Sequence, residues 1–239
     1  MNSKRIALVT GASRGLGRGI AVALAASAGT VIVHSFKNRK GAEETARMVR
    51  KAGAESAVFQ ADLSAEDGAR GLIAAAERKG GRLDILVNNV GPILFRPWDN
   101  LTAADWESMF RENLLSAYFC LTAALPGMRA RRFGRVVNLG FGRVEQLAAF
   151  PTALPYAAAK TGLLLLTRTA AAECRGMGVT VNMVSPGLLK GGIRPAKTVI
   201  PRKELGTFAD VAAAVRFLAA DEARRVTGTN ILVAGTWKM

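Results

Sequence analysis

Short runs of aliphatic and β-branched residues alternate with longer Ala-rich stretches in which apolar residues recur at helical spacing. The short runs predict strands at residues 6–9, 30–34, 57–59, 84–87, 135–139, 179–184 and 230–233. The longer stretches predict helices at 16–27, 42–52, 65–78, 103–110, 113–130, 156–175 and 208–220. Strands that alternate with helices form a parallel sheet covered on both faces, and right-handed crossovers make it doubly wound. We therefore expect one α/β domain spanning residues 1–239. The segment from 186 to 206 is rich in Gly and Pro and predicts a loop.

Composition narrows the class of protein. The chain has 239 residues, of which 50% are hydrophobic and 21% charged, so a disordered chain is excluded and a large core is possible. Two cysteines give no disulfide framework and favour a reducing compartment. The first residues lead directly into a strand pattern without a signal segment. No uncharged apolar run reaches the ~18 residues that a membrane helix needs. We expect a cytoplasmic protein that is not bound in a membrane.

The basic balance raises the question of an anionic partner. Lys and Arg number 33 against 18 Asp and Glu, a formal net charge of +15. Nucleic acid is one candidate, but aromatic residues make up only 6% and no basic helix or stacking platform is recognisable, so solvated arginines are the favoured interpretation. Two stretches carry several basic residues and no acid. They contain Arg129, Arg131, Arg132, Arg135 and Arg143 (113–144), and Arg175, Lys190, Arg194, Lys197, Arg202 and Lys203 (174–203).

A glycine-rich loop joins the first predicted strand to the first predicted helix. It reads Thr10-Gly11-Ala12-Ser13-Arg14-Gly15-Leu16-Gly17. Gly11 lets the chain turn, whereas Gly15 and Gly17 let the backbone approach a pyrophosphate that the N–H groups of the helix start would face. A plain tight turn is the alternative, since a Gly-rich loop alone is a weak signal. Its position between a strand and a helix favours a dinucleotide site.

The end of the second strand favours NADPH over NADH. A NAD site usually has an acid there, which binds the ribose 2′-OH. This sequence has no acid after that strand until Glu43 and offers Ser35 and Lys37, with Arg14 in the glycine loop. Cations and a hydroxyl suit a 2′-phosphate. His34 is the only histidine, and we interpret it as a polar strand-end residue rather than a catalyst.

Tyr156 and Lys160 stand four residues apart at the start of a predicted long helix, so their side chains share one face. An ammonium beside a phenol stabilises the phenolate, and we expect it to lower the Tyr156 pKa from its reference of about 10. A tyrosine tuned in this way can protonate a carbonyl oxygen while a cofactor delivers hydride. The pair alone is common by chance. Its place after the predicted fifth strand and its distance from the glycine loop favour a catalytic role.

Taken together, the motifs resemble those of the short-chain dehydrogenase/reductase family along essentially the whole chain. The matching pieces are the loop 10–17, Asp62-Leu63, Asn88-Asn89-Val90-Gly91, Asn113, the segment 156–160 and Val184-Ser185-Pro186-Gly187. The resemblance implies a Rossmann-type fold, reduction of a carbonyl by NADPH, and a homo-oligomer (a dimer or a 222 tetramer) built on the two long helices. It also implies that 187–206 is a short substrate lid. Within the family the chain is most similar to 3-oxoacyl-carrier-protein reductases.

The resemblance also implies roles for individual residues. Tyr156, Lys160 and Asn113 would be catalytic, with Lys160 also binding the nicotinamide ribose and Asn113 holding a water that links Lys160 to solvent. The residues expected to bind cofactor are Gly11, Ser13, Arg14, Gly15, Leu16, Gly17, Ser35, Lys37, Asp62, Leu63, Asn88, Gly91, Tyr156, Lys160, Pro186 and Gly187. Asp62 would hold the adenine amino group with Leu63 alongside, Asn88 and Gly91 would shape the floor under the adenosine ribose, and Pro186-Gly187 would precede the nicotinamide amide site. No metal site is expected. Cys120 and Cys174 are expected to be buried on the long helices.

One element of the family pattern is missing. The family places a Ser just after the fifth strand, where it orients the substrate carbonyl and stabilises charge on its oxygen. Here the position falls on Gly140 or Phe141 when counted from the strand, and on Arg143 when counted back from Tyr156. The loop therefore has about two additional residues and no hydroxyl. Three explanations are open: another donor takes over (Arg143, Gln146 or a backbone N–H), the substrate needs little orientation, or turnover is weak or absent.

The sequence says least about the substrate. The two basic stretches favour an anionic carbonyl compound, such as a 3-oxoacyl chain on a carrier, or else they only solvate the surface. A pteridine- or quinone-type reductase is a second possibility, because pteridine reductases also lack the Ser. An inactive relative that binds NADP as a regulatory protein is the alternative to an enzyme.

Overall fold

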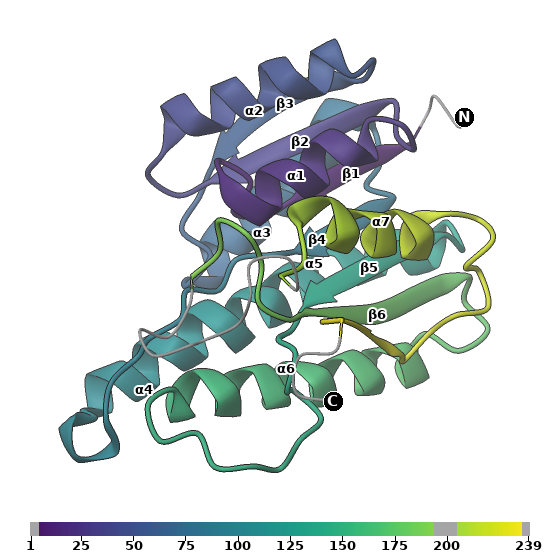
Figure 1. The fold of residues 1–239 in the computed structure, drawn as a ribbon. Helices are drawn as coiled ribbons and strands as arrows, with labels where there is room; N and C mark the ends of the chain where they lie inside the picture. The colour runs from purple at the N-terminus through teal and green to yellow at the C-terminus, as the bar shows by residue number, and fades with distance from the viewer. Residues whose placement is uncertain (1–4, 194–204, 236–239) are drawn as a thin grey trace.

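The computed structural model describes residues 5–193 and 205–235, which form a parallel sheet of seven strands with helices on both faces. The strand order is β3-β2-β1-β4-β5-β6-β7 (Figure 1). The strands are β1 (Ile6–Val9), β2 (Thr30–Ser35), β3 (Glu55–Gln60), β4 (Ile85–Asn88), β5 (Gly134–Leu139), β6 (Val179–Pro186) and β7 (Asn230–Val233). Every neighbouring pair is parallel, which confirms the doubly wound α/β fold.

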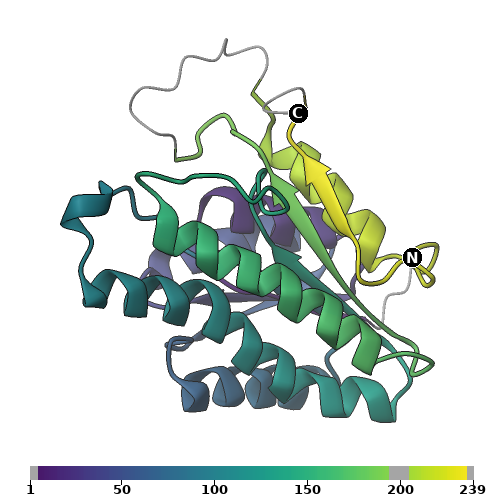
Figure 2. The ribbon, with the colours of Figure 1, turned by 90° about the horizontal axis from the view of Figure 1, so that it is seen from below.

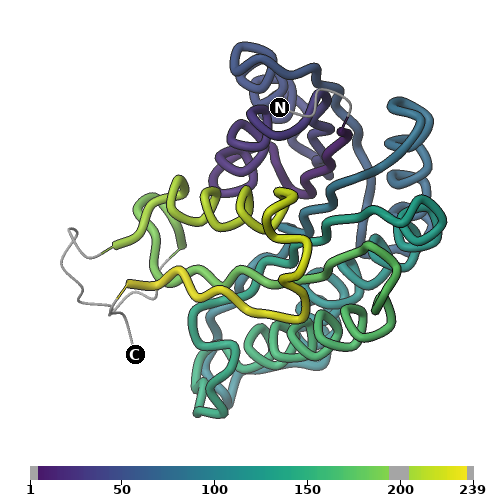
Figure 3. The backbone as a smooth tube through the Cα atoms, turned by 90° about the vertical axis from the view of Figure 1, so that its right-hand side faces the viewer, coloured from purple at the N-terminus to yellow at the C-terminus, as the bar shows by residue number. Residues whose placement is uncertain are grey.

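Two groups of helices cover the sheet. One face carries α1 (Gly15–Leu24), α2 (Arg39–Lys51) and α7 (Phe208–Ala219), and the other carries α3 (Glu66–Gly80), α5 (Ser116–Ala130) and α6 (Leu154–Glu173). α1 and α7 pack side by side (Figure 3), whereas α5 and α6 run along the opposite face (Figure 2). Between β4 and α5 lie η1 (Trp98–Asn100), α4 (Ala103–Phe110) and η2 (Arg111–Leu115).

The central strands are mostly apolar because both faces of the sheet are covered, whereas the edge strand β3 has exposed polar residues at its two ends. Every residue of β1 is buried. Ala7 and Val9 belong to the core with α1, α2 and α7, whereas Ile6 and Leu8 belong to the core with α3, α5 and α6. This alternation follows from the period-two geometry of a strand. It explains why the strand runs in the sequence show no polar alternation.

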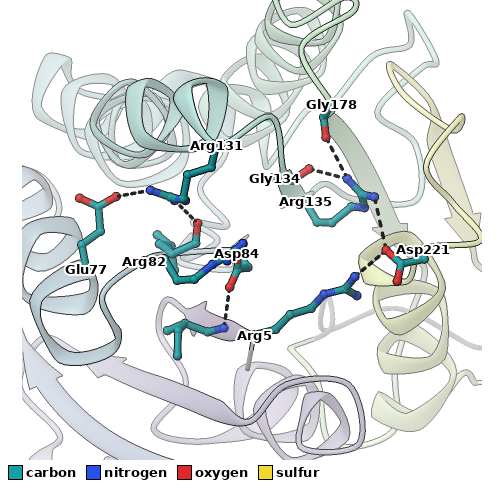
Figure 4. A network of polar contacts seen from close by, with 11 residues as sticks. Arg5, Glu77, Arg82, Asp84, Arg131, Gly134, Arg135, Gly178 and Asp221 are labelled. Carbon is teal, nitrogen blue, oxygen red and sulfur yellow. Dashed lines mark hydrogen bonds and ion pairs between the residues drawn. The ribbon is translucent and has the colours of Figure 1, made fainter. Parts of the chain in front are cut away.

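Part of the first basic stretch stabilises the amino-terminal end of the sheet. Arg135 is buried at the start of β5 and donates to two backbone carbonyls, at 2.9 and 3.2 Å (Figure 4). The guanidinium groups of Arg135 and Arg5 lie 4.5 and 4.6 Å from the centre of the Phe133 ring. Asp221 forms an ion pair of 2.5 Å with Arg5. These arginines hold the fold at the end opposite to the carboxyl ends of the strands.

The loop after β6 is closed at its base. Leu189 and Gly206 form an isolated parallel bridge, and the Lys190 N–H donates to the Gly206 carbonyl at 2.9 Å. The centre of the predicted lid, with Arg194, Lys197, Arg202 and Lys203 of the second basic stretch, lies outside the described residues.

Two further expectations concern buried and membrane-crossing segments. Cys120 and Cys174 are both buried and unpaired, as predicted, and burial raises the pKa of the Cys120 thiol to about 12. Among the helices of residues 5–193 and 205–235, none has the length and apolarity to cross a bilayer.

Candidate active site

The candidate site lies where the strand order reverses between β1 and β4. In open parallel sheets, ligands bind at this switch point, beyond the carboxyl ends of the strands. A cleft of about 980 Å³ opens there. Its lining comes from the glycine loop, the segments that follow β4, β5 and β6, and the first turns of α6. Motifs far apart in the sequence are thus brought together because parallel strands end at the same edge.

The glycine loop has the shape that an anion-binding turn requires. Gly11 and Gly15 have φ of +62° and +55°, a region that favours glycine. A Cβ on Gly17 would lie 2.5 Å from the Gly11 carbonyl oxygen, so any larger residue would displace the loop. α1 begins at Gly15 without a side-chain cap and without an acid in its first turn. Its first N–H groups therefore suit an anion.

Two side chains outside the glycine loop, those of Asn89 and Arg18, hold the loop in place, although the sequence indicates no role for either. Thr10 Oγ1 accepts from the N–H groups of Asn89 (2.9 Å) and Val90 (3.1 Å), and Asn89 Nδ2 donates back to the Thr10 carbonyl at 2.9 Å. Arg18 donates to the Ser13 carbonyl at 2.9 Å. Asn89 was visible in the sequence only as part of a motif. Arg18 carried no signal that separates it from other helix-surface arginines.

His34 connects three strands beneath the loop. Its Nδ1 accepts from the Gly11 N–H at 3.1 Å, and Nε2 lies 3.0 Å from the Ala61 carbonyl, to which it donates in the tautomer that leaves Nδ1 free to accept. The side chain is buried, and burial lowers the pKa of His34 despite the opposing hydrogen bond to Ala61. His34 is therefore a strand-end residue, as predicted, with a specific contact that the sequence did not reveal.

A second hollow of about 560 Å³ adjoins the cleft, and both are bordered by Gly11 and Val90. Asp62 and Leu63 line it, as do His34 and Lys37. Hydrogen bonds from the hydroxyl and the N–H of Ser64 lower the pKa of Asp62, and Lys37 adds to this. The Asp62 carboxylate is thus charged and exposed at the edge of the hollow.

The two cations expected at a 2′-phosphate line different hollows, and Ser35 lines neither. Arg14 lines the cleft and Lys37 lines the second hollow. Ser35 is buried, and its Oγ has no hydrogen-bond partner among the described residues. Arg39, by contrast, pairs with Glu43 at 2.8 Å.

Tyr156 and Lys160 lie on the first turns of α6 and both line the cleft. Lys160 Nζ is 5.9 Å from the centre of the Tyr156 ring and donates to the Leu139 carbonyl at 2.8 Å. Burial lowers the pKa of Lys160 to about 7 and raises the pKa of Tyr156. The expected lowering of the Tyr156 pKa by Lys160 is therefore wrong for this geometry, because burial outweighs a lysine whose own charge is reduced.

Asn113 faces Lys160 across Gly91. It lies in η2, a π-helical turn between α4 and α5, and is fully buried. Asn113 Nδ2 donates to the Pro92 carbonyl at 3.0 Å, whereas Oδ1 is buried without a partner in the described part of the chain. A Cβ on Gly91 would lie 2.5 Å from this oxygen and 2.7 Å from Lys160 Nζ. The glycine thus leaves space for both groups.

The remaining predicted residues divide between the cleft and the sheet. Leu16, Pro186 and Gly187 line the cleft. Asn88 lines neither hollow, and its Nδ2 donates to Asn138 Oδ1 at 2.9 Å inside the protein. Its role under the adenosine ribose stays a prediction.

Phe141, one of the three positions on which the expected Ser can fall, contacts Tyr156. The two rings meet edge-on with centroids 5.5 Å apart, and Phe141 meets Phe150 in the same way at 5.6 Å. Gly140 has no space for a side chain, because a Cβ there would overlap Ser185 Oγ and Met183 Sδ. The guanidinium of Arg143 lies 4.8 Å from the centre of the Phe150 ring. Of the three aligned positions, 141 is therefore the one in ring contact with Tyr156.

The lining of the cleft is apolar and positively charged. Arg14, Arg143 and Lys160 line it, and no Asp or Glu is among its described lining residues. Its walls include Ile93, Phe95, Phe150, Leu188, Ile193 and Phe208.

Comparison with known proteins places this geometry in a family. Residues 11–236 match the family model described as enoyl-(acyl carrier protein) reductase. This chain belongs to the short-chain dehydrogenase/reductase family and is an oxidoreductase of that family. It is 33% identical to the 3-oxoacyl-[acyl-carrier-protein] reductase FabG of Staphylococcus aureus strain Mu50, over 98% of each chain. It is also 33% identical to 3beta-hydroxysteroid dehydrogenase 1 of Eggerthella lenta, over 95% of this chain and 91% of the relative.

Solved structures agree with this assignment. A short-chain alcohol dehydrogenase from Sinorhizobium meliloti 1021, itself described as putative, superposes with a TM-score of 0.85 at 35% identity, covering 95% of this chain and 93% of that one. Acetoin dehydrogenase YohF from Salmonella typhimurium superposes with a TM-score of 0.86 at 26% identity, covering 97% and 95%.

Proposed function

We propose that this chain is an NADPH-dependent carbonyl reductase. One observation carries the proposal: Tyr156 and Lys160 lie on the first turns of α6 in the same cleft as an uncapped, glycine-rich helix start. This arrangement puts a proton donor in the same cleft as a site suited to a dinucleotide pyrophosphate.

The two adjoining hollows fit a dinucleotide. The positive φ of Gly11 and Gly15 and the uncapped start of α1 suit a pyrophosphate, and the exposed Asp62 carboxylate suits an adenine amino group. Arg14 and Lys37 suit a 2′-phosphate, and the Ser35 hydroxyl at the end of β2 is a further polar group without a partner among the described residues. NADPH, when bound, supplies hydride to the substrate.

The side chains around the reacting carbonyl then have distinct tasks. Tyr156 donates its phenolic proton to the carbonyl oxygen as the carbon accepts hydride. Lys160 binds the nicotinamide ribose and, with a pKa of about 7, exchanges a proton readily at neutral pH. Asn113 Oδ1 accepts from a water beside Gly91, through which the proton on Tyr156 is replaced.

Two different surfaces indicate the class of substrate and the assembly. The cationic, acid-free lining of the cleft supports an anionic carbonyl substrate, and a 3-oxoacyl thioester is one candidate, in keeping with the name of the S. aureus relative. Tyr118 on α5 and Leu165 on α6 are exposed apolar side chains, which supports a homo-oligomer through these helices.

A second candidate function is binding of NADP without useful turnover. The phenylalanine in ring contact with Tyr156 favours it, because loss of one oxyanion donor typically costs about 10²–10³ in rate. A pteridine- or quinone-type reductase is a further candidate within the enzyme class.

NADPH oxidation by the purified protein tests the proposal against a panel of 3-oxoacyl thioesters, diketones, quinones and a pterin. Tyr156→Phe should abolish turnover and leave NADPH binding, followed by fluorescence, nearly intact. Tyr118→Phe is the matched control because the chain has two tyrosines. Turnover that survives Tyr156→Phe would refute the mechanism, whereas NADPH binding without turnover would favour the regulatory alternative.

A further inference from the structure

The small number of side-chain hydroxyl groups in the described lining of the cleft limits how a carbonyl can be activated there. Tyr156 and Thr152 are the hydroxyl-bearing residues among its described lining residues. Gly140 has no space for a side chain, and the rings of Phe141 and Tyr156 meet edge to face. A carbonyl held against Tyr156 thus has the phenol as a donor and a hydrocarbon ring beside it, and Thr152 carries the one further side-chain hydroxyl of the described lining.

Arg143 does not replace the missing donor in this geometry. Its Nε donates to Gln146 Oε1 at 2.8 Å, and its guanidinium stacks on Phe150. The loop that carries it is tied to the body of the protein through Glu145, which pairs with Arg168 at 2.5 Å and accepts from Asn230 Nδ2 at 3.1 Å. Arg143 therefore belongs to the wall of the cleft, over the second aromatic ring.

The aromatic side chains define the shape of that wall. Phe141 makes edge-on contacts with both Tyr156 and Phe150, with centroid distances of 5.5 and 5.6 Å. Aromatic groups prefer edge-to-face or offset contacts with other rings, which adds about 0.5–1.5 kcal/mol beyond area burial. A flat aromatic substituent can therefore extend the cluster next to the proton donor.

From these observations we propose that the cleft selects aromatic vicinal dicarbonyl compounds, and that Phe141 determines this specificity. The inference rests on the proposed reductase function. A second carbonyl next to the first withdraws electrons and makes the reacting carbon more electrophilic, so the reaction depends less on an oxyanion donor. The reduction is a balanced two-electron step: NADPH hydride forms the C–H bond, the carbonyl π electrons move to oxygen, Tyr156 supplies the O–H proton, and NADP⁺ leaves.

Four substrates separate the two parts of the proposal with the wild-type protein alone. They are 1-phenyl-1,2-propanedione (aromatic and activated), 2,3-butanedione (activated), acetophenone (aromatic) and an acetoacetyl thioester (neither aromatic nor vicinal). We expect kcat/KM for 1-phenyl-1,2-propanedione to exceed that for acetophenone and the thioester by about 10² or more, the size of one missing donor. It should exceed 2,3-butanedione by about tenfold, the upper range of one aromatic pair.

Two substitutions then assign the effect to Phe141. Phe141→Ser restores a hydroxyl and should raise kcat/KM for acetophenone and the thioester by at least about tenfold while lowering it for the aromatic diketone. Phe141→Leu keeps apolar volume without a ring and should lower only the aromatic preference. If wild type reduces the thioester as well as the aromatic diketone in a Tyr156-dependent manner, the inference is wrong and the reductase function stands. If none of the four is reduced while NADPH is bound, the inference fails, and the quinones and the pterin of the larger panel decide whether the reductase function fails with it.

Discussion

The side-chain oxygen of Asn113 and the Nζ of Lys160 converge on the α-carbon of Gly91. A Cβ at that carbon would lie 2.5 Å from the first atom and 2.7 Å from the second. The convergence depends on the π-helical turn η2, which carries Asn113, and on the first turns of α6, which carry Lys160. A residue without a side chain is thus required between two buried polar groups.

Gly91→Ala should reduce turnover more than it reduces folding. The added methyl group must displace Asn113 or Lys160, and a displacement of about 1 Å at a reacting centre can cost about 10²-fold in kcat/KM. NADPH oxidation and thermal unfolding measure the two effects. Gly71→Ala is the control, because a Cβ on this α3 glycine meets nothing within 4 Å. Equal activity of Gly91→Ala and Gly71→Ala would contradict the role of this space.

Lys160→Met should give an inactive protein that is more stable than wild type at pH 7. Burial lowers the Lys160 pKa from 10.5 to about 7, so the unfolded chain binds more protons than the folded chain between these values. The free energy of unfolding of wild type therefore rises with pH across that window, and the advantage of the methionine variant shrinks. Each kcal/mol gained corresponds to about 2–4 °C in Tm for a chain of this size.

Melting curves of both proteins at pH 7, 8.5 and 10 give the test. Loss of the hydrogen bond to the Leu139 carbonyl should lower the free energy of unfolding of the variant by about 0.5–1.5 kcal/mol. A difference in Tm between the two proteins that stays constant from pH 7 to pH 10 would show that burial does not lower the pKa of this lysine.

His34 should make cofactor binding sensitive to mild acid. Neutral His34 accepts from the Gly11 N–H, whereas protonated His34 cannot. Its folded pKa lies below the reference of 6.5, so the unfolded chain takes up the proton first. The stability contributed by neutral His34 is therefore lost as pH falls from 6.5 through the folded pKa. We expect NADPH affinity to fall as the pH falls through the folded pKa, because His34 of the folded protein takes up its proton only there, and the imidazole NMR signal of the only histidine reports the titration.

The matched variants for this prediction are His34→Asn and His34→Gln. The asparagine oxygen can occupy the position of Nδ1 and accept from Gly11 at any pH, so its NADPH affinity should depend less on pH. The glutamine amide reaches toward the Ala61 carbonyl and leaves the Gly11 N–H unpaired, so binding should be weak throughout. The same pH dependence in wild type and His34→Asn would exclude His34 as its source.

Most of the fold could be predicted because its determinants are local. Apolar runs gave the strands, helical periodicity gave the helices, and their alternation gave the parallel sheet. The π-helical turn η2 could not be predicted, since residues 111–115 have ordinary helix-forming character and the turn depends on packing. The candidate site was predicted through motifs whose spacing is fixed by the strand ends.

Contacts between distant segments explain what the sequence did not reveal. The link from His34 to Gly11 and the link from Thr10 to Asn89 join segments at the carboxyl ends of neighbouring strands. The direction in which the Tyr156 pKa shifts depends on burial, and a spacing of four residues in the sequence does not determine burial. The basic stretch 113–144 reads as one feature in the sequence but is divided between the two ends of β5, with Arg135 at one end and Arg143 beyond the other.

The preference for NADPH over NADH should depend on Arg14 and Lys37. Replacing both with Ala removes two cations suited to the 2′-phosphate and should weaken NADPH binding by about tenfold or more, as expected for loss of one charge-assisted contact of about 1.5–3 kcal/mol. NADH binding should change little. Arg39→Ala is the control, because Arg39 already pairs with Glu43. An equal loss of affinity for NADPH and NADH would show that these cations do not bind the 2′-phosphate.

Substitution of Arg143 should affect substrate recognition, whereas substitution of Arg135 should affect the stability of the fold. Arg143 lines the cleft over Phe150, whereas Arg135 is buried at the amino-terminal end of the sheet and stacks on Phe133. Arg143→Leu should raise KM for benzoylformate several-fold and leave KM for its neutral methyl ester unchanged, with no change in Tm, because one cation near the cleft acts on the charged substrate alone. Arg135→Leu should lower Tm by several degrees, since the carbonyls that it binds lose their donor, and should leave both KM values unchanged. Steady-state kinetics on the acid and ester pair, with melting curves of the same preparations, measure both effects. A shift in KM for the ester as large as that for the acid would mean that Arg143 shapes the wall of the cleft rather than attracting an anion.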